Sequence, residues 1–282
     1  MIGNQNNRKS IVELLRSQMN QSKAILACNF YNYETLKGVL LAAKALECPV
    51  MLQLTRSSID YMGLKVAASM ARNLSELLGV DSYLHLDHGD SVDLVHACLD
   101  EGFDSVMIDG SEKEFAENVK ITRTVVELAK PYGVGVEAEL GYIAKLGQES
   151  AEGDGFTTPE SALQFVKETG IDSLAIAIGS AHGFYKSTPN LRIDLLKSIH
   201  SALDIPLVLH GSSGIPDDQI RQAVSNGICK VNIATEVKNI FMKTLKATLI
   251  ENDDIDLRKV FPFATDSAKL LLEKKLKVVS IS

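Results

Sequence analysis

The sequence lacks the features that mark secreted and membrane proteins. Its four cysteines, Cys28, Cys48, Cys98 and Cys229, are scattered and form no C-x-x-C pair, which is typical of buried thiols in a reducing compartment. No apolar run reaches the roughly 18 residues that a membrane-spanning helix needs, and the polar N-terminus lacks the apolar core of a signal peptide. These absences predict a cytoplasmic protein.

The chain also lacks an excess of positive charge. It has 29 Lys and Arg residues against 36 Asp and Glu residues, a net charge of −7, which argues against nucleic acid as a partner. An anionic substrate would therefore be held by local donors. The apolar fraction of 45% is that of a soluble globular protein.

What the chain does have is a regular alternation of two patterns. Eight short apolar runs are typical of parallel strands buried on both faces, and helical spacing lies between them, as in Thr35–Leu46, Phe115–Ala129 and Ser161–Val166. The alternation predicts an α/β fold, a single (β/α)₈ TIM barrel over residues 1–282 with extra N- and C-terminal helices. The eight runs are Ala24–Asn29, Val50–Thr55, Ser82–Asp87, Asp104–Asp109, Gly133–Glu139, Asp172–Gly179, Ile205–His210 and Ile228–Ile233.

Three histidines lie at the C-terminal ends of three of these runs. His88, His182 and His210 are each followed at once by a glycine, and the C-terminal ends of barrel strands converge on one pocket. Three neutral imidazoles that leave a coordination position open form a catalytic zinc site. A lone histidine is more often a packed core residue, and we interpret His85, His96 and His200 in that way.

Carboxylates accompany the histidines. Asp87 adjoins His88, which suits a proton donor or acceptor, and Glu137 and Glu139 face the same side of one strand. Acids inside a barrel are costly unless they meet a metal or hydrogen-bond donors. Asp109 has two interpretations, a site residue or the cap of the turn that follows it.

The ends of the last two strands have the composition of a phosphate site. The segments 211–214 and 232–235 consist mostly of small or polar residues and precede helices, so backbone N–H groups and helix dipoles could hold a phosphate without a lysine. Barrel enzymes often bind phosphate at this position. The alternative is that both segments are simply tight turns.

Together these residues resemble the class II, zinc-dependent ketose-bisphosphate aldolases, and most closely the tagatose-bisphosphate aldolase catalytic subunits. The resemblance runs from about Ile25 to the terminal helix, through six motifs in order. The motifs are H-L-D-H-G (85–89), S-V-M-I-D-G-S (105–111), V-E-A-E-L-G (136–141), T-G-I-D-S-L-A-I-A-I-G-S-A-H-G (169–183), P-L-V-L-H-G-S-S-G-I-P (206–216) and C-K-V-N-I-A-T-E (229–236).

The resemblance implies a zinc-dependent aldolase that reversibly cleaves tagatose or fructose 1,6-bisphosphate to dihydroxyacetone phosphate and glyceraldehyde 3-phosphate. It assigns one catalytic zinc ion to His88, His182 and His210, with Glu137 and Glu139 near the metal. It also makes Asp87 the group that moves the proton of the substrate hydroxyl. The residues that it assigns to substrate binding are Asn29, Gly183, Gly211, Ser212, Ser213, Asn232, Ile233, Ala234 and Thr235.

Further implications concern cofactors and partners. A monovalent cation is a second candidate cofactor, the substrate is a phosphorylated ketose, and the chain is expected to form a homodimer or homotetramer. Some relatives work with a second, non-catalytic subunit.

Two segments depart from the family pattern. The loop 142–158 is shorter than usual, and Glu149, with Glu152 in reserve, is the candidate for the acid that moves the carbon-bound proton. The usual C-terminal group for a distal phosphate is absent, so either Arg56 holds that phosphate or the substrate lacks it.

The alternatives are an aldolase for a different phosphorylated ketose and a phosphosugar-binding subunit with little turnover. A metal-dependent hydrolase or epimerase would not need the phosphate loops. A Schiff-base aldolase would use Lys230 and leave the three histidines unexplained.

Overall fold

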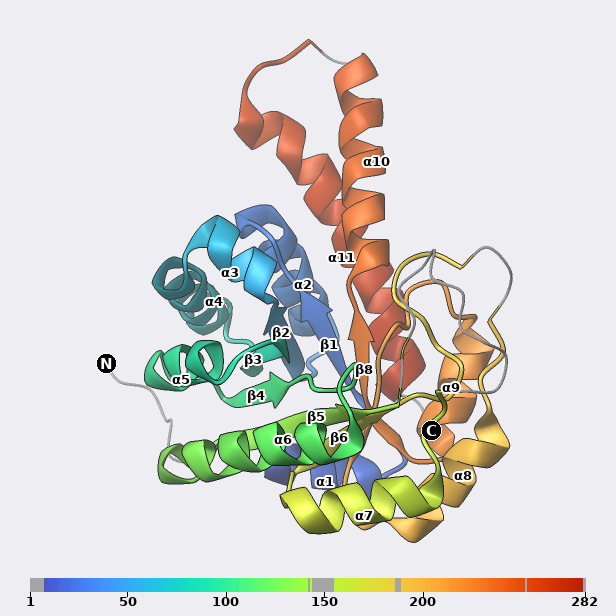
Figure 1. Cartoon of the computed structure of the whole chain (residues 1–282). Coiled ribbons are helices and arrows are strands. Elements are labelled where there is room, and N and C mark those ends of the chain that lie inside the picture. Colours follow the sequence, from blue (N-terminus) through green and yellow to red (C-terminus); the bar gives the residue numbers. More distant parts are fainter. Residues whose placement is uncertain (1–7, 142, 144–154, 186–188, 252, 281–282) are drawn as a thin grey trace.

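The eight predicted strands form a closed parallel barrel. The computed structural model describes residues 8–141, 143, 155–185, 189–251 and 253–280. Each strand pairs with the next along the chain, and β1 pairs with β8 to close the barrel (Figure 1). The predicted α/β barrel is thus confirmed. The strands are β1 (Ile25–Asn29), β2 (Val50–Leu54), β3 (Ser82–Gly89), β4 (Ser105–Ile108), β5 (Gly135–Leu140), β6 (Ser173–Ile176), β7 (Leu207–Leu209) and β8 (Ile228–Ile233).

Helices surround the barrel and follow the strands in sequence, as the alternating pattern predicts (Figure 1). Local capping fixes several of their starts: Asn32 and Thr35 form a capping box at α2, and Thr158 and Ser161 form one at α7. The helices are α1 (Ile11–Asn20), α2 (Tyr33–Ala45), α3 (Arg56–Met62), α4 (Leu64–Leu78), α5 (Val92–Asp100), α6 (Phe115–Ala129), the 3₁₀ turn η2 (Lys130–Tyr132), α7 (Pro159–Thr169), α8 (Ile193–Ala202), α9 (Asp217–Ser225), α10 (Thr235–Glu251) and α11 (Leu257–Ser280).

The N-terminal helix α1 packs on the barrel interior. Its buried face, which includes Ile11 and Leu15, forms a cluster with Ile25, Met51 and Tyr83 from the first three strands. These strand residues lie at or near the starts of β1, β2 and β3. The helix therefore closes the N-terminal end of the barrel and leaves the C-terminal end for the site.

The last two helices form a long pair that rises away from the barrel (Figure 1). The lower part of α11 packs closely against α2, where a Cβ on Gly38 would lie 3.2 Å from the Thr265 carbonyl oxygen, so glycine favours this close approach. Within the described ranges, no helix has the length and apolar character that crossing a bilayer requires.

Candidate metal centre and active site

The three strand-end histidines come together at the C-terminal end of the barrel. One ring nitrogen from each of His88, His182 and His210 lies within 4.8 Å of the other two. The ring centroid of His88 is 4.9 Å from that of His182 and 4.7 Å from that of His210. A cavity of about 590 Å³ lies beside them, and its lining includes His88, His182 and Glu139. The set therefore faces a space that a substrate can enter.

The backbone around His88 is held in an unusual conformation. His88 has a positive φ of 48°, and the pairing of β3 with β4 is irregular between Leu86 and Gly89. A Cβ on Gly89 would lie 2.3 Å from the Met107 carbonyl oxygen, so only glycine allows the strands to approach here. Positive φ at a non-glycine residue stores strain that is typical of functional sites.

The partner of His88 determines which of its nitrogens is free. The Nδ1 atom lies 2.7 Å from Oδ2 of Asp109, and Asp109 Oδ1 accepts hydrogen bonds from the backbone N–H and the hydroxyl of Ser111 at 3.0 and 2.7 Å. A carboxylate can only accept, so His88 donates its Nδ1–H, and Nε2 is the nitrogen left to bind a metal. Asp109 thus caps the turn and orients the histidine, which unites the two interpretations of this residue.

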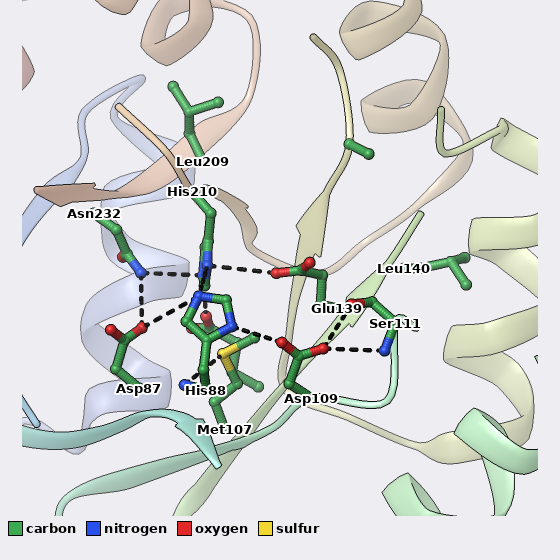
Figure 2. A network of polar contacts seen from close by, with 12 residues as sticks. Asp87, His88, Met107, Asp109, Ser111, Glu139, Leu140, Leu209, His210 and Asn232 are labelled. Carbon is green, nitrogen blue, oxygen red and sulfur yellow. Dashed lines mark hydrogen bonds and ion pairs between the residues drawn. The ribbon is translucent and has the colours of Figure 1, made fainter. Parts of the chain in front are cut away.

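His210 is oriented in the same way from the opposite side. Its Nε2 atom lies 2.9 Å from Oε1 of Glu137, which leaves Nδ1 unprotonated. That Nδ1 is 3.0 Å from Nε2 of His88 (Figure 2), so only one proton or one cation can lie between the two nitrogens. Glu139 Oε2 lies 3.4 Å from the same Nδ1 and makes no hydrogen bond to any of the described residues. A divalent cation bound by His88, His210 and Glu139 would satisfy both of these contacts, so the residues present fit a metal ion.

The pKa values of the cluster also favour a bound cation. Burial lowers the pKa of His88, but Asp87, Asp109 and Glu139 outweigh that effect and raise it to about 10. Burial raises the pKa of Glu139 to about 8. Burial also lowers the pKa of His210 well below its usual value. In the metal-free protein the site therefore retains a proton on His88, where a bound cation would replace it.

Asp87 is held between two amides at the edge of this cluster. Its Oδ2 accepts a hydrogen bond from the Asn29 side chain at 2.8 Å and its Oδ1 accepts one from Asn232 at 3.3 Å. Burial raises the pKa of Asp87, but the charges of His88 and Lys230 and the bond from Asn29 outweigh burial, so the pKa is lowered. The carboxylate is therefore ionised and fixed in direction at neutral pH.

The loops after β6, β7 and β8 are tied to one another. The Tyr185 hydroxyl accepts from the Ala181 N–H and donates to the Gly211 carbonyl, both at 2.7 Å, and Ser213 Oγ accepts from the Ala234 N–H at 3.4 Å. Gly211 has a φ of 66°, and a Cβ there would lie 2.5 Å from the Ala181 carbonyl oxygen. The predicted phosphate segments thus lie together beside the loop that carries His182.

Other predicted residues lie elsewhere. Glu137, expected near the metal, lies behind His210 and contacts Lys230. It belongs to neither group of donors that could share a metal ion, the three histidines or His88 with Asp109 and Glu139. Arg56 makes a two-pronged ion pair with Asp90. Glu149 and Glu152 lie outside the described residues. The histidines interpreted as structural are His85, which is fully buried in β3, His96 in α5 and His200 in α8.

Sequence reasoning missed two residues of the site. Gln53 is a buried polar residue in the middle of β2. Its Nε2 lies 3.5 Å from Asp87 Oδ1, and the opposite amide orientation would satisfy its neighbours better. An uncharged polar side chain inside an apolar strand was the available signal. Tyr185 had no signal, because its role depends on a loop conformation.

Comparison with known proteins identifies the family. A profile described as "Fructose-bisphosphate aldolase class-II" matches residues 9–282. The chain belongs to the class II fructose-bisphosphate aldolase family. This family is generally zinc-dependent, and the histidine and carboxylate donors described above suit that metal.

The names of similar proteins agree with this family. The chain is 41% identical over 234 residues to the "D-tagatose-1,6-bisphosphate aldolase subunit GatY" of Klebsiella oxytoca, and the matched region covers 82% of each chain. It is 39% identical over 275 residues to the "Fructose-bisphosphate aldolase" of Geobacillus stearothermophilus, 95% of each chain. The crystal structure of the YdjI aldolase from Escherichia coli superposes with a TM-score of 0.85 at 33% identity, over 95% of this chain and 96% of the other.

Proposed function

We propose that this protein cleaves a ketose 1,6-bisphosphate, tagatose or fructose 1,6-bisphosphate, reversibly to dihydroxyacetone phosphate and glyceraldehyde 3-phosphate. The observation that carries the proposal is the pair of facing nitrogens of His88 and His210, 3.0 Å apart, beside the fixed carboxylate of Asp87. Such a site combines a place for a Lewis acid with a positioned base.

His88, His182 and His210 would hold the metal, with Glu139 within reach. A bound zinc ion supplies Lewis-acid stabilisation of the negative charge that develops on the ketone oxygen, worth several kcal/mol. Asp87 takes the proton of the C4 hydroxyl in cleavage and returns it in condensation. Its low pKa and the hydrogen bond from Asn29 keep it ready to accept.

The substrate would lie across the cavity with its ketone end toward β7 and β8. Backbone N–H groups near Gly183 and in the segments Gly211–Ser213 and Asn232–Thr235, including Ile233 and Ala234, hold the phosphate of the dihydroxyacetone half. Asn29 and Asn232 already bond Asp87, so they also align substrate hydroxyls with the base. Glu149 remains the candidate for the carbon-bound proton, and a monovalent cation remains a candidate beside the phosphate.

One observation favours a second substrate class. Arg56, the candidate for the distal phosphate, is already bound by Asp90, a residue that lines the cavity. A distal phosphate would have to compete with that carboxylate, so a ketose with a single phosphate is the second candidate. A phosphosugar-binding subunit with little turnover is the outcome if neither class is cleaved.

We also infer that the protein is cytoplasmic and that it forms a homodimer or homotetramer, with a second non-catalytic subunit as a further possible partner. Ile250 in α10 is 85% exposed, and Ile255, just before α11, is 94% exposed. Exposed aliphatic side chains near the tip of a projecting pair of helices support self-association. Light scattering on the purified chain tests this: a monomer at micromolar concentration would contradict it.

The proposed activity is tested by supplying tagatose and fructose 1,6-bisphosphates to the zinc-loaded protein and measuring release of triose phosphate. Cleavage of either supports the proposal, and the ratio of rates gives the sugar preference. Cleavage of neither bisphosphate would contradict it, and ketose monophosphates assayed in parallel would then decide between the second substrate class and a binding role.

A further inference from the structure

A second charged cluster lies inside the barrel, one layer below the histidines. Its members are Lys230 on β8, Glu137 on β5 and His85 on β3, and each is no more than 2% exposed. Lysine and glutamate are almost never fully buried unless they are paired. The proposed reaction uses neither Lys230 nor Glu137 to bind or change the substrate, so their burial needs another explanation.

Lys230 uses its donors on this cluster. Its Nζ atom lies 2.8 and 3.0 Å from the two carboxylate oxygens of Glu137 and 3.3 Å from Nε2 of His85. In the amide orientation that satisfies its neighbours, Gln53 also accepts from Nζ at 3.2 Å. An ammonium engaged in this way has no lone pair, which makes Lys230 a counter-charge and not a nucleophile.

Glu137 connects this lysine to the metal centre. Besides the two contacts with Lys230, its Oε1 lies 2.9 Å from Nε2 of His210. The three side chains thus form a continuous chain from Lys230 through Glu137 to His210, and they do so in a region with no access to water. Asp109, the corresponding carboxylate behind His88, keeps 24% of its side chain exposed and receives its donors from Ser111 instead.

We propose that Lys230 is a positioning residue for the metal centre: its ammonium holds the Glu137 carboxylate against Nε2 of His210, so that Nδ1 of His210 faces the bound cation. The inference rests on the metal site of the proposed function but not on any substrate. Partners of this kind behind metal ligands typically contribute about 10–100-fold to metal affinity.

The test compares zinc affinity in two variants. K230M removes the charge and keeps a long apolar side chain, and zinc should dissociate about 10–100-fold more readily than from the wild type. In E137Q/K230M the buried cluster carries neither charge, and the glutamine oxygen can still accept from His210, so most of the lost affinity should return. The dissociation constant is measured by competition with a chromophoric chelator, and the absorption of bound Co²⁺ reports ligand geometry.

The proposal would be overturned if K230M bound zinc as tightly as the wild type, or if E137Q/K230M bound zinc no more tightly than K230M. A merely structural lysine would lower the melting temperature without changing zinc affinity. K275M is the matched control, because Lys275 is also largely buried and paired, with Asp217 at 2.9 Å and Glu236 at 3.4 Å. Its zinc affinity should equal that of the wild type.

A further comparison covers the case in which K230M does not fold, since breaking a buried pair is strongly destabilising. In the E137Q background Lys230 has no carboxylate to hold, so E137Q/K230M should bind zinc at least as tightly as E137Q. A tenfold weaker affinity in the double variant would contradict the proposal. No sugar is present in these measurements, so a missing aldolase activity would count against the proposed function alone.

Discussion

Replacing Asp87 by alanine should separate proton transfer from metal binding. The carboxylate is ionised and fixed by Asn29 at 2.8 Å, and it is the acid–base group proposed for the C4 hydroxyl. Loss of such a group costs about 10²–10⁴ in rate, which is about 3–5 kcal/mol of transition-state stabilisation. Asp87 belongs to neither group of donors that could share a metal ion, so zinc content should not change.

Turnover is measured by coupled detection of triose phosphate, and zinc by elemental analysis. Exchange of the carbon-bound hydrogen of dihydroxyacetone phosphate with solvent does not involve the C4 hydroxyl, so it should persist in the Asp87→Ala protein. Asp93→Ala is the control, because Asp93 is an exposed acid in the first turn of α5. Unchanged turnover in zinc-loaded Asp87→Ala, or loss of zinc from it, would refute the assigned role.

Three further predictions concern the same pocket. His182→Ala should lose zinc and activity together, and a variant that keeps both would remove His182 from the ligand set. Zinc binding at pH 7.5 should release between about one and two protons and tighten as the pH rises, because the raised pKa values of His88, about 10, and Glu139, about 8, keep both groups largely protonated in the metal-free protein; calorimetry in buffers of different ionisation enthalpy measures this, and a binding constant independent of pH would contradict it. Tyr185→Phe should raise KM by about fivefold, equivalent to one lost hydrogen bond of about 1 kcal/mol, with zinc content unchanged; an unaltered KM would show that the link between Ala181 and Gly211 is dispensable.

The order of elements followed from the sequence because burial on both faces gives strands a continuous apolar pattern. The run predicted over Phe115–Ala129 is helix α6 with the same bounds. Positions at strand ends then followed from topology, which places His88, His182 and His210 at one end of the barrel. Strand limits near the site were less accurate: β3 continues past Asp87 to Gly89, because the irregular pairing around His88 adds residues that no periodic pattern indicates.

Contacts between side chains could not be predicted in the same way. Alternation places Glu137 and Glu139 on one side of β5, but it does not give their depth, and only the packed barrel shows that Glu137 meets Lys230 while Glu139 faces the cavity. Asp109 illustrates the same limit, since its hydrogen bond to His88 joins residues from neighbouring strands. The pairing of Arg56 with Asp90 likewise joins side chains 34 positions apart, which no local pattern indicates.

The central claim is that one metal ion held by three histidines is required for aldol cleavage. The most direct test titrates zinc into the metal-stripped protein and follows cleavage of the ketose bisphosphate. The account predicts that activity is absent at the start, rises with each addition and stops rising at one zinc ion per chain. Full activity in the metal-free protein, or no dependence on added zinc, would contradict it.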